Sequence, residues 1–166
     1  MIFSLKHIHF LIQNNKIRPV LLYKKRKTGK AGWVTRDEAG LFVSAGQARG
    51  RTNNSAIENE FQALIFAMQN CWSHGYTRVC FEGDNMELLK ILNDGKARFD
   101  LYNWVREVQA WRNRFRECKF TWVTRMTNKP ADLLAKAHLF REEHFKFYST
   151  IPPVIYIALS FDYISS

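Results

Sequence analysis

The stretch "RVCFEGDNMELLKILNDG", residues 78–95, changes its hydrophobic period in the middle. Its first part is the apolar run of a buried strand over 78–83, and its second part has the helical spacing of apolar residues over 85–93. At the junction, Asp84 stands at the carboxyl end of the strand, the edge where open α/β sheets place their ligands. Asp84 therefore either caps the following helix or holds a metal ion.

The segments on either side are predicted from the same signals of period, caps and turns. In chain order they are a hairpin of strands 33–36 and 41–45, a helix from the Ser55–Glu58 capping box to Gly75, the strand and helix above, a helix at about 101–116, a strand at 119–125 and a helix at 128–140. Strands separated by helices imply parallel neighbours, and the hairpin makes the sheet mixed. We therefore expect an α/β domain over 29–140, preceded by an atypical arm (1–28) and followed by a loosely packed extension (141–166).

The helix at about 101–116 has two dissimilar faces. One carries an apolar stripe of Leu101, Trp104, Val108, Trp111 and Phe115. This spacing favours a core-facing stripe over a platform for stacked bases. The other face carries Arg106, Arg112 and Arg116. These arginines either follow a phosphate backbone or form an ordinary solvated face.

The composition is that of a globular, basic protein. Apolar residues make up 46% of the 166 residues, and 25 Lys and Arg against 15 Asp and Glu give a net charge of +10. Such a surplus favours a polyanionic partner, either nucleic acid or an anionic membrane surface. The basic run 24–30, "KKRKTGK", is either a solvated linker or a nuclear-localisation signal.

Three widely spaced cysteines without a CxxC pair predict neither a disulfide framework nor a cysteine zinc site. They fit a reducing, intracellular location, in the nucleus or cytosol. The first 16 residues lack the apolar core and cleavage site of a signal peptide, and no run is long enough to span a membrane. We expect no membrane association, and we favour a monomer.

Three acidic residues interrupt apolar patterns. Glu60 shares a helix face with Leu64, Asp84 closes a strand, and Asp132 shares a helix face with Ala135. Glu60 and Asp132 also suit the positive amino ends of their helices, and Asp84 with Glu87 imitates a capping box. Taken together, carboxylates at one sheet edge repel one another unless a cation lies between them. Such oxygen ligands suit Mg²⁺ or Mn²⁺, and two ions roughly 4 Å apart activate water for phosphodiester hydrolysis.

Two segments resemble the ribonuclease H superfamily: "SAIENEFQALIFAMQNCWSHGYTRVCFEGDNMELLKILNDG" and "KFTWVTRMTNKPADLLAKAH". The resemblance covers about 29–150 and is closest to the reverse-transcriptase-like domains of plant retroelements and their domesticated derivatives. It implies a mixed five-stranded sheet flanked by helices, and two-metal hydrolysis of the RNA strand in RNA–DNA hybrids. It carries over three catalytic and metal-binding residues, Glu60, Asp84 and Asp132. Glu82 does not correspond to a family ligand.

The fourth ligand implied by the resemblance, an Asp of the first strand, has no counterpart. Between Asn15 and Asp37 there is no Asp or Glu, and Asp37 lies in the hairpin turn, at the wrong end of the strand. Losing one ligand misplaces the metal, which removes both water activation and leaving-group stabilisation. In the loop before the last helix, Arg125 and Asn128 are candidate nucleic-acid contacts, although Asn128 is also a candidate helix cap.

Three hypotheses remain open from the sequence. The first is a nucleic-acid-binding protein of the ribonuclease H type, an RNA–DNA hybrid endonuclease by family and impaired as written. The second is a non-catalytic nucleic-acid-binding module on the same fold. The third is a protein-interaction remnant whose charge is incidental. Whether the chain is an enzyme is left open.

Overall fold

The computed structural model describes residues 18–25, 29–51, 55–95 and 98–164. Residues 1–17 lie outside the described residues. They include most of the predicted arm and the segment for which we predicted no signal peptide. Among the described residues, none of the helices is both long enough and apolar enough to cross a membrane.

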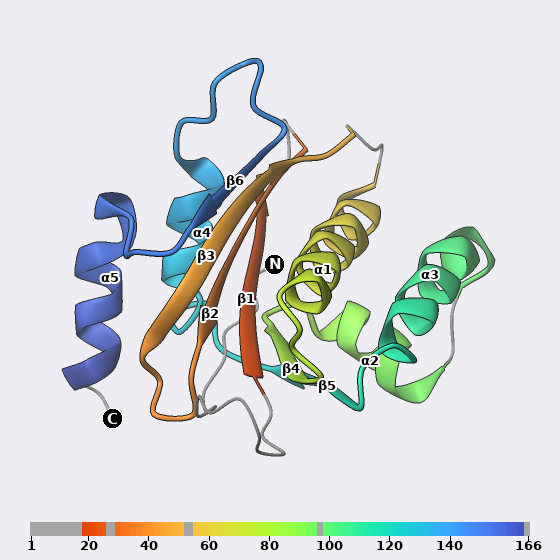
Figure 1. Cartoon of the computed structure of the whole chain (residues 1–166). Coiled ribbons are helices and arrows are strands. Elements are labelled where there is room, and N and C mark those ends of the chain that lie inside the picture. The colour runs from red at the N-terminus through yellow and green to blue at the C-terminus, as the bar shows by residue number, and fades with distance from the viewer. Residues whose placement is uncertain (1–17, 26–28, 52–54, 96–97, 165–166) are drawn as a thin grey trace.

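Six strands form one mixed sheet in the order β5-β4-β1-β2-β3-β6 (Figure 1). The strands are β1 (Arg18–Lys25), β2 (Lys30–Arg36), β3 (Phe42–Arg49), β4 (Arg78–Gly83), β5 (Glu117–Trp122) and β6 (Phe145–Tyr148). β1 pairs antiparallel with β2 and parallel with β4, and β4 pairs parallel with β5. The predicted hairpin is β2 and β3, and the predicted parallel neighbours are confirmed.

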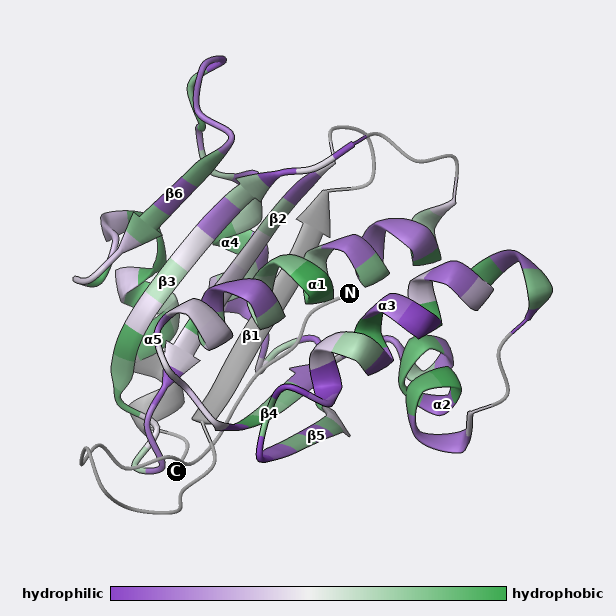
Figure 2. Cartoon of the chain, turned by 45° about the vertical axis from the view of Figure 1, so that its right-hand side comes forward, coloured by the Kyte–Doolittle hydropathy of each residue, from purple (hydrophilic) through white to green (hydrophobic). Residues whose placement is uncertain are grey.

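Helices cover both faces of the sheet. They are α1 (Ala56–Ser73), α2 (Met86–Asp94), α3 (Tyr102–Arg112, after a 3-10 turn at Phe99–Leu101), α4 (Lys129–Lys136) and α5 (Pro153–Ile164). α1, α2 and α3 lie on one side of the sheet, and α4 and α5 lie on the other (Figure 1). Hydrophobic and hydrophilic residues alternate in bands along α1 (Figure 2), as expected for a helix with one face on a sheet.

The larger core lies under α1, α2 and α3. It contains Phe61 and Met68 of α1, Phe81 of β4 and Val108 of α3, none of which is accessible to solvent. The apolar stripe predicted for a helix at about 101–116 belongs to this core, although α3 itself ends at Arg112. Leu101, Val108 and Phe115 are buried, and Trp104 and Trp111 are partly buried against them. The interpretation of this stripe as core is therefore confirmed.

The sheet uses residues on both sides of the predicted 29–140 domain. β1 comes from the predicted arm, and β6 comes from the predicted extension. The sheet consequently has six strands where the family resemblance implied five, because β6 pairs antiparallel with β3. The extension is also not loosely packed, since Ile155 and Leu159 of α5 are buried with α4 in a second core. Neither β6 nor α5 was predicted, because the segment 141–166 contains a proline pair and has no clear hydrophobic period.

Two helix starts test the predicted caps. The backbone N–H of Ser55 donates a hydrogen bond to Oε2 of Glu58 at 3.3 Å, as the predicted capping box requires. Asn128 occupies the cap position of α4, but its side chain makes no capping hydrogen bond. The interpretation of the Asn128 side chain as a cap is therefore wrong. α4 also ends at Lys136, earlier than the predicted residue 140.

Candidate active site

Asp84 lies at the carboxyl end of β4. The next residue, Asn85, and not Asp84, caps the helix that follows. The side chain of Asn85 accepts a hydrogen bond from the backbone N–H of Leu88 at 3.1 Å and caps α2. The alternative in which Asp84 caps this helix is therefore wrong. Glu87 belongs to no capping box with Asp84 and instead forms an ion pair with Arg98 at 3.2 Å.

The Asp84 carboxylate is mostly shielded from solvent and faces a basic side chain. Its side chain is 12% exposed, and its Oδ2 lies 3.7 Å from Nε of Arg125. Arg125 belongs to the loop between β5 and α4, and its own side chain is 74% exposed. The same loop is tied to the end of β4, because the Val123 N–H donates to the carbonyl of Gly83 at 2.9 Å. This backbone bond brings Asp84 and Arg125 to the same edge of the sheet.

Asp132 lies in the first turn of α4, buried and paired with lysines of its own helix. Nζ of Lys136 lies 2.6 Å from Oδ1 of Asp132 and donates a hydrogen bond to Oδ2 at 2.7 Å. Nζ of Lys129 is 3.9 Å from Oδ2. The two lysines therefore supply positive charge beside this carboxylate. The sequence reasoning missed them, although the spacing of four residues between Asp132 and Lys136 is that of a helical ion pair.

The first-strand position can be located from the strand register. β1 and β4 pair with Leu21 opposite Glu82, so two residues further along both strands Tyr23 stands alongside Asp84. In the antiparallel pair, Tyr23 lies opposite Gly32 of β2. A Cβ atom built on Gly32 would lie 2.6 Å from the Ala135 nitrogen and 2.8 Å from the Ala131 carbonyl oxygen. The turn of α4 that carries Asp132 is therefore packed directly on this row of the sheet.

No acidic residue occurs in β1, whose sequence is "RPVLLYKK". The position beside Asp84 is held by a tyrosine, and Asp37 lies beyond the opposite end of β2. There, Oδ1 of Asp37 accepts hydrogen bonds from the N–H groups of Ala39 and Leu41, so it stabilises the hairpin turn. The prediction that Asp37 cannot replace the missing ligand agrees with this placement.

The remaining predicted carboxylate, Glu60, is on α1 and is partly exposed. Among the described residues, no group of three or more His, Cys, Asp and Glu side chains is arranged to hold a metal ion. The donor set of Glu60, Asp84 and Asp132 thus does not fit the complete two-metal centre that the family resemblance implies. Cys80, two residues before Glu82, is also no ready ligand, because burial raises the pKa of its thiol to about 11.

The second predicted nucleic-acid contact, Asn128, is fully buried. Its backbone carbonyl accepts the Asp132 N–H at 3.3 Å, which closes the first turn of α4. Its side-chain amide has no hydrogen-bond partner within the described part of the chain. Arg125 is exposed and Asn128 is not, so the loop presents only the first of the two to a ligand in this conformation.

These elements agree with a known family. The sequence profile of a family described as reverse transcriptase-like matches residues 20–138. The chain belongs to this family. The matched range takes in most of β1 as well as α4, and so the whole row of Tyr23, Gly32 and Asp84.

Solved structures show the same fold at low sequence identity. The ribonuclease H1 of the archaeon Halobacterium salinarum is 23% identical, with a TM-score of 0.62, over 70% of this chain and 91% of that chain. LC11 ribonuclease H1, solved in complex with an RNA/DNA hybrid, is 18% identical, with a TM-score of 0.60, over 71% of this chain and 91% of that chain.

A third structure is the N-terminal ribonuclease H domain of a Mycobacterium tuberculosis protein. It is 19% identical, with a TM-score of 0.57, over 72% of this chain and 90% of that chain. No curated protein matches the chain. The chain therefore has the ribonuclease H fold and lacks an acidic residue at the first-strand position of the candidate active site.

Proposed function

We propose that this chain binds RNA–DNA hybrids, or a related nucleic-acid duplex, and hydrolyses them weakly or not at all. One observation carries the proposal: Tyr23 takes the position beside Asp84, so β1 contributes no carboxylate. Without that ligand, an ion at this edge lacks the fixed coordination that two-metal hydrolysis requires. Glu60, Asp84 and Asp132 are then the remaining members of an ancestral Mg²⁺ or Mn²⁺ site.

Three properties support binding. The net charge of +10 attracts a polyanion and accelerates its association. Arg125 is 74% exposed beside Asp84, and an exposed guanidinium group is a side chain that contacts phosphates. The related LC11 protein was solved with an RNA/DNA hybrid. None of the three cysteines, all within the described residues, forms a disulfide bond, which suits action in the reducing nucleus or cytosol.

The test replaces the first-strand residue. The unsubstituted chain, Tyr23→Asp and Tyr23→Asn are each incubated with a labelled RNA–DNA hybrid and either Mg²⁺ or Mn²⁺. We expect binding without appreciable cleavage by the unsubstituted chain. Tyr23→Asp should gain metal-dependent cleavage, because it restores a carboxylate beside Asp84, whereas the uncharged Tyr23→Asn should not.

Titration calorimetry with Mn²⁺ alone gives a second readout, in which only Tyr23→Asp should gain affinity. Robust cleavage by the unsubstituted chain that disappears in Asp84→Asn would show that the site is active without a first-strand carboxylate. Failure to bind hybrid, duplex RNA or duplex DNA at low salt would reject nucleic-acid binding and leave the protein-interaction remnant.

A further inference from the structure

A basic and aromatic surface lies at the opposite end of the parallel strands from the candidate active site. It is formed where α1 and α3 end and β5 begins, and we call it the Trp72 patch. Its members are Trp72, Trp111, Arg112, Arg114 and Arg116. The strands that separate it from Asp84 are six residues long, or roughly 20 Å at about 3.3 Å per residue.

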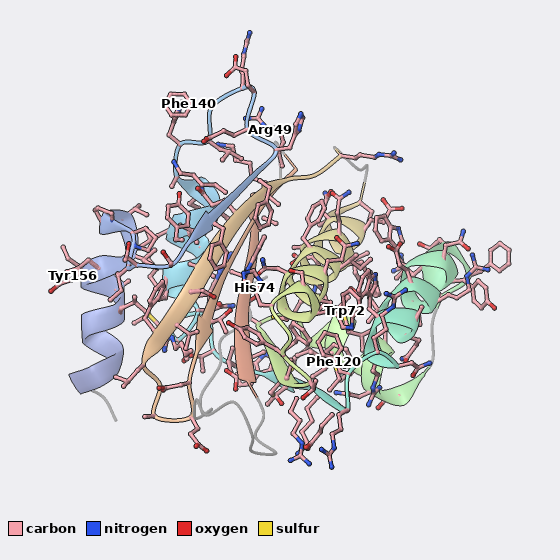
Figure 3. The ribbon with its side chains drawn as sticks, in the orientation of Figure 1. Arg49, Trp72, His74, Phe120, Phe140 and Tyr156 are labelled. Carbon is pink, nitrogen blue, oxygen red and sulfur yellow. The ribbon has the colours of Figure 1, made fainter. Side chains whose placement is uncertain are left out.

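The aromatic rings of the patch are held in place by arginines. The ring centroids of Trp72 and Trp111 are 6.1 Å apart with an edge-on geometry. The guanidinium carbon of Arg114 lies 4.5 Å from the Trp111 ring centroid and 5.3 Å from that of Trp72. Arg112 lies over the Phe120 ring at 5.4 Å. In Figure 3, Trp72 and Phe120 are seen on the side of the sheet that carries α1 and α3.

Trp72 remains accessible in this arrangement. It is 46% exposed, although it belongs to the last turn of a helix whose other apolar residues are largely buried. Arg114 and Arg116 are also exposed. An exposed indole ring beside a planar guanidinium group is a surface on which a nucleobase can stack, because both groups interact favourably with a π-system.

The charge of the patch is not balanced by neighbouring carboxylates. Within the described residues, no ion pair joins Arg112, Arg114 or Arg116 to an acid. Glu117, which follows Arg116, pairs with Arg78 and Lys119. Glu107 is one turn before Trp111 and lines a separate pocket with Arg51. The helix dipole favours one basic residue near the end of α3, but it does not explain three arginines in this region.

We propose that the Trp72 patch binds single-stranded nucleic acid, with a base stacked on Trp72 and Arg114 and phosphates contacted by Arg112 and Arg116. The combination of an aromatic platform with uncompensated basic side chains is the chemistry that single-stranded nucleic acid recognises. The patch is distant from Asp84, so this binding requires neither hybrid recognition nor hydrolysis. An unpaired strand held here extends the contact of a duplex bound at the other end.

The experiment measures the affinity of the chain for a labelled U12 RNA by fluorescence anisotropy over a series of salt concentrations. Trp72→Leu removes the stacking ring and keeps an apolar side chain, and Arg116→Gln removes one exposed charge. Two matched controls lie elsewhere. Tyr156→Leu removes an exposed aromatic ring (63% exposed) from α5, on the other face of the sheet, and Arg141→Gln removes a charge from an exposed loop.

We expect Trp72→Leu to weaken binding of U12 by about five-fold or more at constant salt dependence, since one stacked base is lost. Arg116→Gln should reduce the slope of log K against log salt by about 0.7, the value for one phosphate contact to a single strand. Both controls should stay within about two-fold at physiological salt, where distant charges are screened.

The proposal is overturned if Arg116→Gln and Arg141→Gln behave alike and Trp72→Leu binds U12 as tightly as Tyr156→Leu. Trp72 packs against its neighbours, so unfolding midpoints are measured for every variant. Arg116 makes no such contact, and its variant decides the matter if Trp72→Leu unfolds. Binding of an RNA–DNA hybrid is measured in parallel. If the unsubstituted chain does not bind the hybrid, the proposed function is wrong. If a patch variant binds the hybrid normally but U12 weakly, the defect is specific to the Trp72 patch.

Discussion

At the scale of single residues, Asp132 and Lys136 lie one turn apart on α4 and form an ion pair in the candidate active site. The Asp132 side chain is only 7% exposed, and a lysine ammonium takes the place beside it. In a complete two-metal centre, a divalent ion would compensate such a buried carboxylate. In this structure, Lys136 of the same helix supplies a positive charge beside the acid.

Replacing Lys136 with Met should therefore lower the free energy of unfolding by about 1–2 kcal/mol, because a buried carboxylate loses its closest partner. The value is discounted because the Lys136 side chain is 47% exposed and partly screened. Urea unfolding at pH 7 measures it. Lys90→Met, on the exposed face of α2, is the matched control, and adding Asp132→Asn to Lys136→Met should recover most of the loss. No recovery would mean that Lys136 stabilises α4 by packing alone.

The thiols of Cys80 and Cys118 give a residue-scale prediction with pH. Burial raises their pKa values to about 11 and about 12, above the ordinary value of 9.0. Raised pKa values mean that the folded state keeps its protons longer than the unfolded state, so stability is intact below pH 9 and falls between pH 9 and 12. From pH 8 to 10 the loss should be about 1 kcal/mol per thiol. Urea unfolding of Cys80→Ala/Cys118→Ala should show a smaller drop over this range; an equal drop would assign it to other groups.

At the scale of elements, the contact between α4 and β2 decides where Asp132 lies. Gly32 allows the α4 backbone to approach the sheet directly over the row that contains Tyr23. The other end of α4 is held by side-chain donors, since Gln47 donates to the Leu134 carbonyl and Lys30 to the Ala137 carbonyl at 3.2 Å. The Tyr148 hydroxyl of β6 in turn donates to Gln47 at 2.6 Å.

Gly32→Ala should destabilise the fold by about 2–4 kcal/mol, in the range of severe overpacking. The added Cβ would meet backbone atoms of Ala131 and Ala135, which no change of rotamer can move. Thermal unfolding measures the effect. As a control for overpacking, Gly32→Ala is compared with Ala39→Val in the exposed hairpin turn, which should be nearly neutral. A stable Gly32→Ala variant would show that α4 can shift away from β2, and with it Asp132.

At the scale of the whole molecule, the sheet is covered on both faces and each face has its own core. The second core joins Val34 and Ala45 of the sheet to Ala131 and Leu134 of α4 and Ile155 of α5. The carboxyl-terminal segment is therefore part of the domain, although other residues of α5, such as Tyr156, point away from the molecule (Figure 3).

Ile155→Ala should cost about 2–4 kcal/mol in the free energy of unfolding, the usual loss for a buried aliphatic residue. Ile157→Ala, on the same helix and 70% exposed, should change it by less than about 0.5 kcal/mol. Guanidinium unfolding of both variants tests this pair. Equal small effects would indicate that α5 contributes no core to the folded domain.

The comparison of sequence with structure depends on which interactions are local. Helical spacing from Ile57 to Cys71 and the apolar strand before Asp84 were enough to predict α1, β4 and their order, because periodicity reflects burial of one face. The absence of an acid in the first strand was also evident from the sequence alone. Whether Asp84 caps α2 stayed open in the sequence, because both Asp84 and Asn85 are good capping residues and only the structure shows that Asn85 accepts the Leu88 N–H.

The sequence by itself determined the family, the order of most elements and the lack of a first-strand carboxylate, because these depend on residue type and spacing along the chain. Only the tertiary structure decided that Tyr23 stands beside Asp84, that β6 and α5 complete the domain, and that Arg114 brings Trp72 and Trp111 together. Those relations join residues far apart in the chain, and they follow from strand register and helix packing, which no local pattern encodes.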